Sequence, residues 1–364
     1  MKILIVNQHP RDVIGGSQIQ CDLIATYLTR SGHRVVYLAV NGKQSSYSTP
    51  YEVEPIRLGF RPLCRALVRY QPDVVYWRFN RRKLLQAVLA CKWRKVKIVF
   101  AISSESDVIK WPQRVKFDQL SWQDFLRKMP ALLRQLFTMR LQYVGYYGID
   151  GVIAQLEQQT GKLPIRHEVV IYNSVENTVC PFQWNKPFVA WVGNFKGIKH
   201  PDLFVELARQ CRDLDVDFLM VGEISEEYRQ KFQQITLPGN LHLLGPKSYC
   251  EVNGMLQYAL CLVHTSSVDG FSNVLIQSWM QATPTISLWY DPDKMATRHQ
   301  IGMVSGTFER LINDTKILLD DEQLRHSMGQ RAQLFAQAHL RPEENIRNLE
   351  QFLKAICEES HGTD

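Results

Sequence analysis

Two lysines stand in a loop between a predicted strand and a predicted helix. The strand FVAWV is followed by Gly193, Lys196 and Lys199, and a helical pattern begins at Pro201. A lysine ammonium can stabilise the negative charge that accumulates on a departing diphosphate, and it needs no metal ion to do so. Their residue type and their place after a strand make Lys199 and Lys196 candidate catalytic cations. A solvated loop is an equal alternative for Lys196.

A carboxylate and a glycine turn precede a second predicted helix, in the segment DGFSNVLIQ. Asp269 can accept hydrogen bonds from hydroxyl groups, and Gln277 offers a neutral acceptor eight positions later. Backbone N–H groups at the start of the helix can hold a diphosphate, and the residues there are Phe271, Ser272, Asn273 and Val274. The alternative is an ordinary helix start, capped by one of the two middle residues.

A pair of glycines lies between the first predicted strand and the first predicted helix. Gly15 and Gly16 permit close approach of the backbone to a ligand, and the helix start offers N–H groups to a phosphate. A tight turn without a ligand is the alternative, because the GxGxxG dinucleotide fingerprint is absent.

Two further loops follow predicted strands in the second half of the chain. Ligands of open α/β sheets bind at the carboxyl ends of the strands. The residues at these ends are Gly222 and Glu223 after DFLMVG, and Pro246 and Lys247 after LHLLG.

Short aliphatic runs alternate with amphipathic segments along the chain, which is typical of doubly wound α/β domains. The rhythm restarts after residue 185, so we predict two α/β domains with parallel sheets and a cleft between them. Residues 1–170 form the first domain, residues 171–342 the second, and a C-terminal helix over 343–364 completes the first.

Charge, cysteine content and the lengths of the apolar segments limit the partners and the location that we expect for this protein. Residues 1–180 carry a net charge of +13 and residues 181–364 a net charge of −6, so the first half favours anionic partners. The eight cysteines show no paired two-residue spacing and are predicted to be reduced, mostly buried thiols. The N-terminus lacks the apolar core of a signal peptide, and no window is long enough to span a bilayer. A cytoplasmic protein is the simplest expectation.

The ordered motifs resemble those of the GT-B glycosyltransferases of family four over nearly the whole chain. The motifs are GGSQIQCDLIATYLTRSGHRV, VIYNSVE, WVGNFKGIKHPDLFVELA, LHLLGPKSYCEVNGMLQYA and DGFSNVLIQSWMQATPTIS. The resemblance implies two Rossmann-like domains and a retaining, metal-independent transfer without any cofactor besides a nucleotide-sugar co-substrate, a UDP- or GDP-sugar. It places the glycine loop and the two helix starts at the cleft.

Three positions depart from the family pattern. Asn194 stands where the family has arginine, and Asp269 and Gln277 stand where it has two glutamates that meet the transferred sugar and the ribose. Aspartate keeps the charge with one methylene fewer, whereas glutamine keeps only an acceptor oxygen. These departures imply either an altered donor or a weakened site.

The resemblance also places an acceptor-side histidine after the strand KIVFAI. This chain has Ser103, Ser104 and Glu105 there, and a hydroxyl is a poor general base. Between Lys110 and Arg140, aromatic and aliphatic residues mix with basic ones, which favours a segment that lies on an anionic membrane. Ordinary core packing is an equal alternative for its leucines, and nucleic acid ranks last.

The leading hypothesis is a retaining hexosyltransferase that extends a glycan or a lipid-linked acceptor in cell-surface polysaccharide or lipopolysaccharide synthesis, peripheral on the inner face of the membrane. The alternatives are a non-catalytic glycosyltransferase-like binding subunit, and a GT-B nucleotide-sugar epimerase or phosphorylase.

Overall fold

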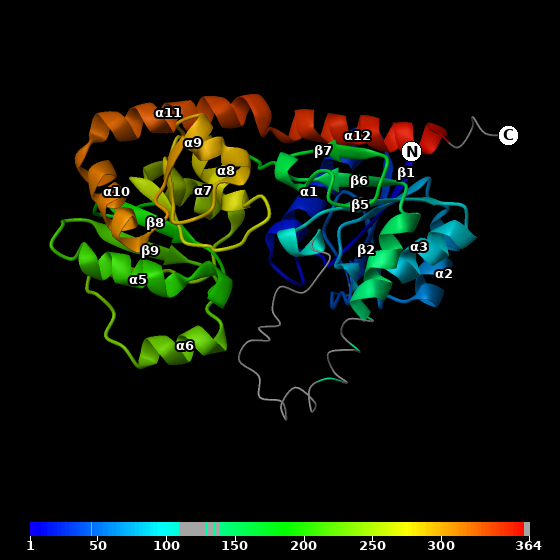
Figure 1. Ribbon diagram of the computed structural model, residues 1–364, viewed down its shortest axis with the longest axis horizontal. Helices are drawn as coiled ribbons and strands as arrows, with labels where there is room; N and C mark the ends of the chain where they lie inside the picture. The colour runs from blue at the N-terminus through cyan, green and yellow to red at the C-terminus, as the bar shows by residue number, and fades with distance from the viewer. Residues whose placement is uncertain (45, 109–128, 130–133, 135–137, 360–364) are drawn as a thin grey trace. The chain divides into compact units, whose positions relative to one another are not determined.

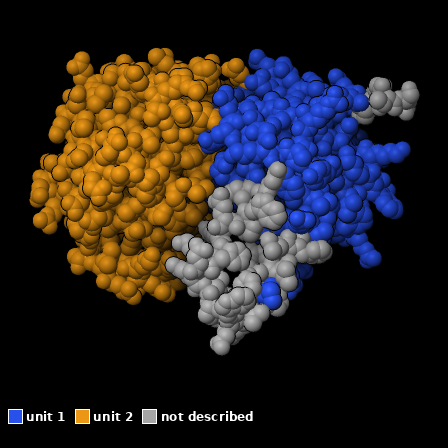
Figure 2. All heavy atoms as spheres, in the orientation of Figure 1, with its two compact units in different colours: residues 1–172, 345–364 blue, residues 173–344 orange. Residues whose placement is uncertain are grey.

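The computed structural model describes residues 1–44, 46–108, 129, 134 and 138–359, and it divides into two compact units. Unit 1 comprises Met1–Tyr172 and Asn345–Asp364, and unit 2 comprises Asn173–Glu344 (Figure 2). Each unit is built on one parallel sheet, so the predicted fold class of two doubly wound α/β domains is confirmed. In the part of the chain that is described, no helix has the length and apolar character needed to cross a bilayer.

Unit 1 contains a seven-stranded sheet in the order β3-β2-β1-β4-β5-β6-β7 (Figure 1). The strands are β1 (Lys2–Asn7), β2 (Arg34–Val40), β3 (Glu52–Ile56), β4 (Val74–Trp77), β5 (Lys97–Ala101), β6 (Gly151–Ala154) and β7 (Glu168–Val170). Helices α1 (Gly16–Arg30) and α12 (Pro342–Glu358) cover one face of the sheet, and α2 (Phe60–Tyr70) and α3 (Leu84–Trp93) cover the other. Short 3-10 turns lie at η1 (Arg81–Lys83), η2 (Glu105–Asp107), η4 (Gly145–Gly148) and η5 (Glu157–Gln159).

Unit 2 contains a six-stranded sheet in the order β10-β9-β8-β11-β12-β13. The strands are β8 (Phe188–Val192), β9 (Asp217–Val221), β10 (Leu241–Leu243), β11 (Cys261–His264), β12 (Thr285–Ser287) and β13 (Gly302–Val304). The helices are α5 (Pro201–Gln210), α6 (Glu226–Gln233), α7 (Tyr249–Tyr258), α8 (Asn273–Met280), α9 (Met295–Arg298), α10 (Phe308–Asp320) and α11 (Glu322–His339), with 3-10 turns η6 (Gly197–Lys199) and η7 (Pro292–Lys294).

The strand order of unit 2 reverses direction between β8 and β11. From β8 the chain moves outward through β9 and β10, and it then returns to β11 and continues through β12 and β13 on the other side. The loops after the neighbouring strands β8 and β11 therefore lie side by side at the carboxyl end of the sheet, and the chain continues from them toward opposite edges. Open α/β sheets bind ligands at such a place. Both predicted catalytic segments follow these two strands.

The cysteine prediction was wrong for one pair, because Cys180 and Cys250 form a disulfide. Cys180 lies in the segment before β8 and Cys250 in the first turn of α7. The backbone N–H of Cys180 donates to the carbonyl oxygen of Cys250 at 3.0 Å, which holds the two segments together. A separation of 70 residues gives no local signal in the sequence. The other six cysteines are free thiols.

Gly254 in α7 makes room for the same segment. A Cβ atom on Gly254 would come within 1.9 Å of the carbonyl oxygen of Cys180, which is backbone and cannot rotate away. We expect Gly254→Ala to destabilise the chain by about 3 kcal/mol, the upper range for overpacking. That corresponds to a melting temperature lower by about 6 °C or more.

Differential scanning calorimetry measures this effect, and Gly239→Ala is the matched control. A Cβ atom on Gly239 meets nothing within 4 Å. Equal melting temperatures for the two variants would contradict the packing described here.

Candidate active site

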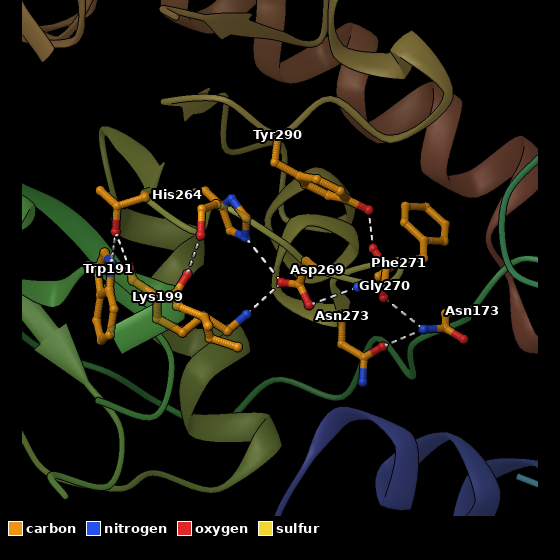
Figure 3. Close-up of polar contacts among 12 residues, drawn as sticks. Asn173, Trp191, Lys199, His264, Asp269, Gly270, Phe271, Asn273 and Tyr290 are labelled. Carbon is orange, nitrogen blue, oxygen red and sulfur yellow. Dashed lines mark hydrogen bonds and ion pairs between the residues drawn. The ribbon is translucent and has the colours of Figure 1, made fainter. Parts of the chain in front are cut away.

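The two predicted catalytic segments of unit 2 meet at the carboxyl ends of β8 and β11 (Figure 3). Lys199 ends the turn η6 after β8, and Asp269 lies in the loop between β11 and α8. The Lys199 Nζ donates to the Asp269 Oδ2 at 2.5 Å. The two side chains are 23% and 20% exposed, so the ion pair is largely but not fully shielded from solvent. Partial shielding strengthens the pair while it leaves room for a ligand.

A histidine that the sequence reasoning missed completes this cluster. His264 is the last residue of β11 and is 4% exposed. Its Nε2 lies 3.3 Å from the Asp269 Oδ2, so the neutral imidazole carries its proton on Nε2 and donates it to the carboxylate. Within the described residues, its Nδ1 is buried with no hydrogen-bond partner. The available signal was a histidine at the end of the apolar run CLVH.

The environment shifts the pKa of both groups. Burial lowers the pKa of His264, and the nearby Lys199 ammonium adds to this, so together they outweigh the opposing hydrogen bond with Asp269. Burial would raise the pKa of Asp269, but the Lys199 ammonium and the hydrogen bond from His264 outweigh burial and hold that pKa well below the ordinary value. The cluster at neutral pH is thus a lysine ammonium, a carboxylate and a neutral imidazole.

The lowered pKa of His264 predicts a pH-dependent stability. The pKa of His264 is lower in the folded chain than the 6.5 of the unfolded chain. The stability of the fold is therefore at its full value above pH 6.5. It decreases as the pH falls from 6.5 toward the folded pKa, because the unfolded chain then binds a proton that the folded chain does not. We expect the stability of the wild-type chain, relative to His264→Gln, to fall between pH 7 and pH 5 by at most about 1.4 kcal/mol per pH unit, the slope of one proton. Urea titrations of both proteins measure it. Parallel pH curves would contradict a buried, neutral His264.

Buried hydrogen bonds hold the Lys199 backbone in place. The Thr265 Oγ1 donates to the carbonyl oxygen of Lys199 at 2.6 Å, and the Trp191 Nε1 donates to the Thr265 Oγ1 at 2.9 Å. Thr265 is fully buried beside the end of β11. These bonds fix η6, because Trp191 lies in β8 and Thr265 directly follows β11.

The start of α8 lies beside the ion pair. Ser272 occupies the N-cap position, but its side chain makes no capping hydrogen bond, so the ordinary capping role proposed for it is not found. The Asn173 Nδ2 donates to the carbonyl oxygen of Phe271 at 2.8 Å and to the Asn273 Oδ1 at 3.1 Å. The Tyr290 hydroxyl donates to the carbonyl oxygen of Gly270. Val274 follows in the first turn of α8 and is buried. These contacts fix the turn before α8.

The loops after β8 and β9 approach each other closely at two glycines. Gly222 has a φ of +146°, and a Cβ atom there would come within 2.0 Å of the carbonyl oxygen of Gly193. The backbone N–H of Glu223 donates to the Asn194 Oδ1 at 3.4 Å. Asn194, which stands at the position where the family pattern has arginine, therefore contacts the neighbouring loop.

The remaining predicted donor residues are less engaged with the cluster. Lys196 is exposed, and no carboxylate of the described residues lies within salt-bridge distance of it. Pro246 and Lys247 are exposed, and the Lys247 Nζ lies 3.4 Å from the Glu251 Oε1. Gln277 is 4% exposed.

The amide of Gln277 is directed into unit 2. Its Nε2 donates to the Asn253 Oδ1 at 2.8 Å and to the carbonyl oxygen of Tyr249 at 3.3 Å, which joins α8 to α7. A glutamate at this position would place a carboxylate where these two acceptors lie, so the neutral side chain suits its neighbours.

The residues predicted on the acceptor side belong to unit 1. Gly15 is the N-cap of α1 and Gly16 its first residue. After β5, the Ser103 Oγ donates to the Asp107 Oδ2 at 2.8 Å, and the backbone N–H of Ser104 donates to the same oxygen at 3.1 Å. The structure therefore uses these serines to hold a buried carboxylate.

Glu105 in unit 1 is also paired. Its Oε2 lies 3.4 Å from the Lys162 Nζ, and its Oε1 accepts from the Gln159 Nε2 at 3.3 Å. Most of the predicted membrane segment between Lys110 and Arg140 lies outside the described residues.

Comparisons with known proteins find similarity to glycosyltransferases in sequence and in fold. Residues 180–335 match the family model described as Glycosyl transferases group 1. A curated relative, an uncharacterised glycosyltransferase of Methanocaldococcus jannaschii, is 26% identical over 188 residues, which cover 46% of this chain and 48% of the relative. The match thus spans about half the length of that protein.

Two solved structures resemble nearly the whole chain. HepE of Anabaena, in complex with UDP-glucose, has a TM-score of 0.75 and 15% identity, and the match covers 98% of this chain and 100% of HepE. Sucrose-phosphate synthase of Thermosynechococcus elongatus has a TM-score of 0.76 and 13% identity, covering 98% and 99%. The chain therefore has the GT-B fold of these structures, and residues 180–335 of its second unit match the Glycosyl transferases group 1 domain.

Proposed function

We propose that the chain is a retaining enzyme of family four that transfers a hexose from a UDP- or GDP-sugar to a hydroxyl group of its acceptor. The observation that carries the proposal is the ion pair of Lys199 and Asp269, which lies where the strand order of unit 2 reverses and beside the start of α8. An ammonium and helix N–H groups at one place suit a diphosphate. The bound UDP-glucose in HepE supports a nucleotide-sugar donor.

Lys199 is the group that we assign to the leaving diphosphate. Of its three N–H donors one goes to Asp269, and no other described side chain receives the remaining two, so they can reach phosphate oxygens while the ion pair persists. The bond from the anomeric carbon to the diphosphate oxygen breaks, and the bond from that carbon to the acceptor oxygen forms on the same face of the sugar. The acceptor proton passes to a diphosphate oxygen. The transfer then needs neither a metal ion nor a side chain as base.

We further propose that the acceptor is a glycan or a lipid-linked sugar of cell-surface polysaccharide synthesis, reached from the cytoplasmic side of a membrane. The charge asymmetry supports this, because the basic half of the chain contains most of unit 1, to which the acceptor side is assigned. The net charge of +13 over residues 1–180 favours an acceptor or a surface that carries phosphate.

A thermal-shift panel followed by a transfer assay tests the proposed function. UDP-, GDP-, ADP- and TDP-sugars are each added to the purified chain, because a ligand that binds only the folded state raises its melting temperature. We expect a shift with UDP- or GDP-sugars and turnover of the same donor in the presence of EDTA. The proposal fails if no donor is hydrolysed or transferred while a matched relative is active in the same assay.

A second candidate function is a binding subunit that no longer transfers sugar. Two observations favour it: the Asn194 oxygen accepts from the neighbouring loop, and the Gln277 amide is bonded inside unit 2. The variant Gln277→Glu separates the two functions, because a gain of turnover would indicate a decayed site. A donor-induced thermal shift without any turnover would favour the binding subunit.

A further inference from the structure

Three neighbouring segments form the outer side of one sheet face in unit 1. Helix α2 packs against α3 (Figure 1), and α3 also packs against η4. The contact between α3 and η4 is tight, since a Cβ atom on Gly145 would come within 2.9 Å of the Leu85 backbone nitrogen. The inner residues of all three segments enter the same core, among them Leu67, Val88 and Tyr146. Their outward residues consequently share one surface, which we call the α2–α3 face.

Large apolar side chains are exposed on this face. Val68 of α2 is 50% exposed, Leu89 and Trp93 of α3 are 53% and 73% exposed, and Tyr147 of η4 is 68% exposed. Leu89 and Trp93 are four residues apart, so they lie on the same side of α3. Single exposed apolar residues are ordinary, but a group on adjoining elements indicates an interaction surface.

The same face is strongly basic. From Arg57 to Lys97 the sequence contains twelve lysines and arginines and a single acidic residue, Asp73. Some of these cations are paired, as in the 2.8 Å contact between Lys92 and Asp150. Within the described part of the chain, however, six exposed cations of this region have no carboxylate within 4.0 Å, and they are Arg57, Arg61, Arg65, Arg82, Arg94 and Lys95. The local field is therefore positive and uncompensated.

We propose that the α2–α3 face docks unit 1 on an anionic lipid bilayer. Tryptophan and tyrosine rings settle at the headgroup level, and aliphatic side chains gain by entering the acyl boundary. The lysines and arginines are attracted to anionic headgroups, with their stems lying along apolar surface. Nucleic acid would satisfy the cations but leave Val68 and Leu89 in water, so the mixture of charges and aliphatics favours a membrane.

The proposal concerns a surface of unit 1 and does not rest on the reaction assigned to unit 2. It is also separate from the segment 110–140, because every residue that defines the face is described. A chain that binds vesicles but transfers no sugar would refute the proposed function alone, and the reverse result would refute the docking surface alone.

Vesicle flotation of the full chain tests the docking surface. The vesicles are phosphatidylcholine alone, or phosphatidylcholine with a third of phosphatidylglycerol. We expect partition onto the anionic vesicles only, and release as the salt concentration rises toward 1 M, where charges are screened within about 3 Å. The triple variant Arg61→Gln, Arg65→Gln, Lys95→Gln is expected to weaken partition at least about tenfold. Trp93→Ser is expected to weaken it severalfold without altering the salt dependence.

The matched controls lie on unit 2. Arg298→Gln, Arg310→Gln, Lys316→Gln removes the same charge from exposed positions, and Leu334→Ser removes an apolar residue that is 67% exposed. Both controls are expected to partition like the wild type. Equal losses in the controls and the α2–α3 variants, equal binding to neutral vesicles, or binding to a DNA duplex in place of the vesicles would each overturn the proposal.

Discussion

Replacing Lys199 with alanine is expected to lower kcat by about 10²- to 10³-fold, the usual effect of removing one preorganised group that stabilises developing charge. The Lys199 ammonium is 23% exposed and held 2.5 Å from Asp269, so its position is fixed before the donor binds. Thr265 fixes its backbone as well. Because the charge on the diphosphate is largest in the transition state, the loss falls on kcat more than on KM. Steady-state kinetics with the donor identified by thermal shift measures it.

Lys196→Ala is the matched control for this prediction. Lys196 lies three residues earlier in the same loop and is exposed. Lys196→Ala removes the same single positive charge as Lys199→Ala, but Lys196 makes no ion pair with a described carboxylate that would hold its ammonium in place. We expect a loss of less than about tenfold, as for an exposed charge. If the two variants lost activity equally, the catalytic charge would belong to the loop as a whole and the assignment of Lys199 would be wrong.

The second large effect concerns Asp269, at which the family pattern has glutamate. Its Oδ2 accepts from Lys199 and lies 3.3 Å from the His264 Nε2, and its Oδ1 accepts from the Gly270 backbone N–H at 3.1 Å. The extra methylene of Asp269→Glu would move the carboxylate by about 1 Å or more, which disturbs all three contacts and shifts Lys199. A displacement of this size typically costs about 10²-fold in rate. We therefore expect Asp269→Glu to lower kcat/KM rather than to restore a lost activity.

The same assay includes two companion variants. Asp269→Asn keeps the shape but removes the charge that holds Lys199, and it is expected to lower kcat/KM by a similar factor. Asp213→Glu adds a methylene to a carboxylate that is 90% exposed, so it should leave the kinetics unchanged. A rise in turnover with Asp269→Glu would show that this site is a decayed version of the family pattern.

Local patterns in the sequence predicted the sheets and the positions of the Lys199 and Asp269 segments after their strands. Buried apolar runs such as KILIVN and FVAWV predict central strands of parallel sheets, because such strands are covered on both faces. Lys199 and Asp269 were each placed after such a strand, and the carboxyl ends of neighbouring parallel strands lie at the same edge of a sheet. Their meeting therefore follows from the order of the elements. The strand order and the registers could not be predicted from the sequence and are known only from the structure.

Three side-chain contacts could not be predicted from the sequence. His264 ends an apolar strand and belongs to no motif, so its contact with Asp269 depends on how the following loop turns back. The disulfide of Cys180 and Cys250 depends on the path of a segment without regular structure. The bond from Gln277 to Asn253 joins two helices whose relative rotation is set by core packing.

The central claim is that Lys199 binds the diphosphate of the donor, and isothermal titration calorimetry tests it most directly. The dissociation constants of the matching nucleoside diphosphate and of the free nucleoside are measured for the wild type and for Lys199→Ala. We expect the wild type to bind the diphosphate far more tightly than the nucleoside. In Lys199→Ala, the ratio of the nucleoside to the diphosphate dissociation constant is expected to fall at least about tenfold, as for the loss of a charge-assisted contact. The nucleoside should bind both proteins equally. An unchanged preference for the diphosphate in Lys199→Ala would contradict the account.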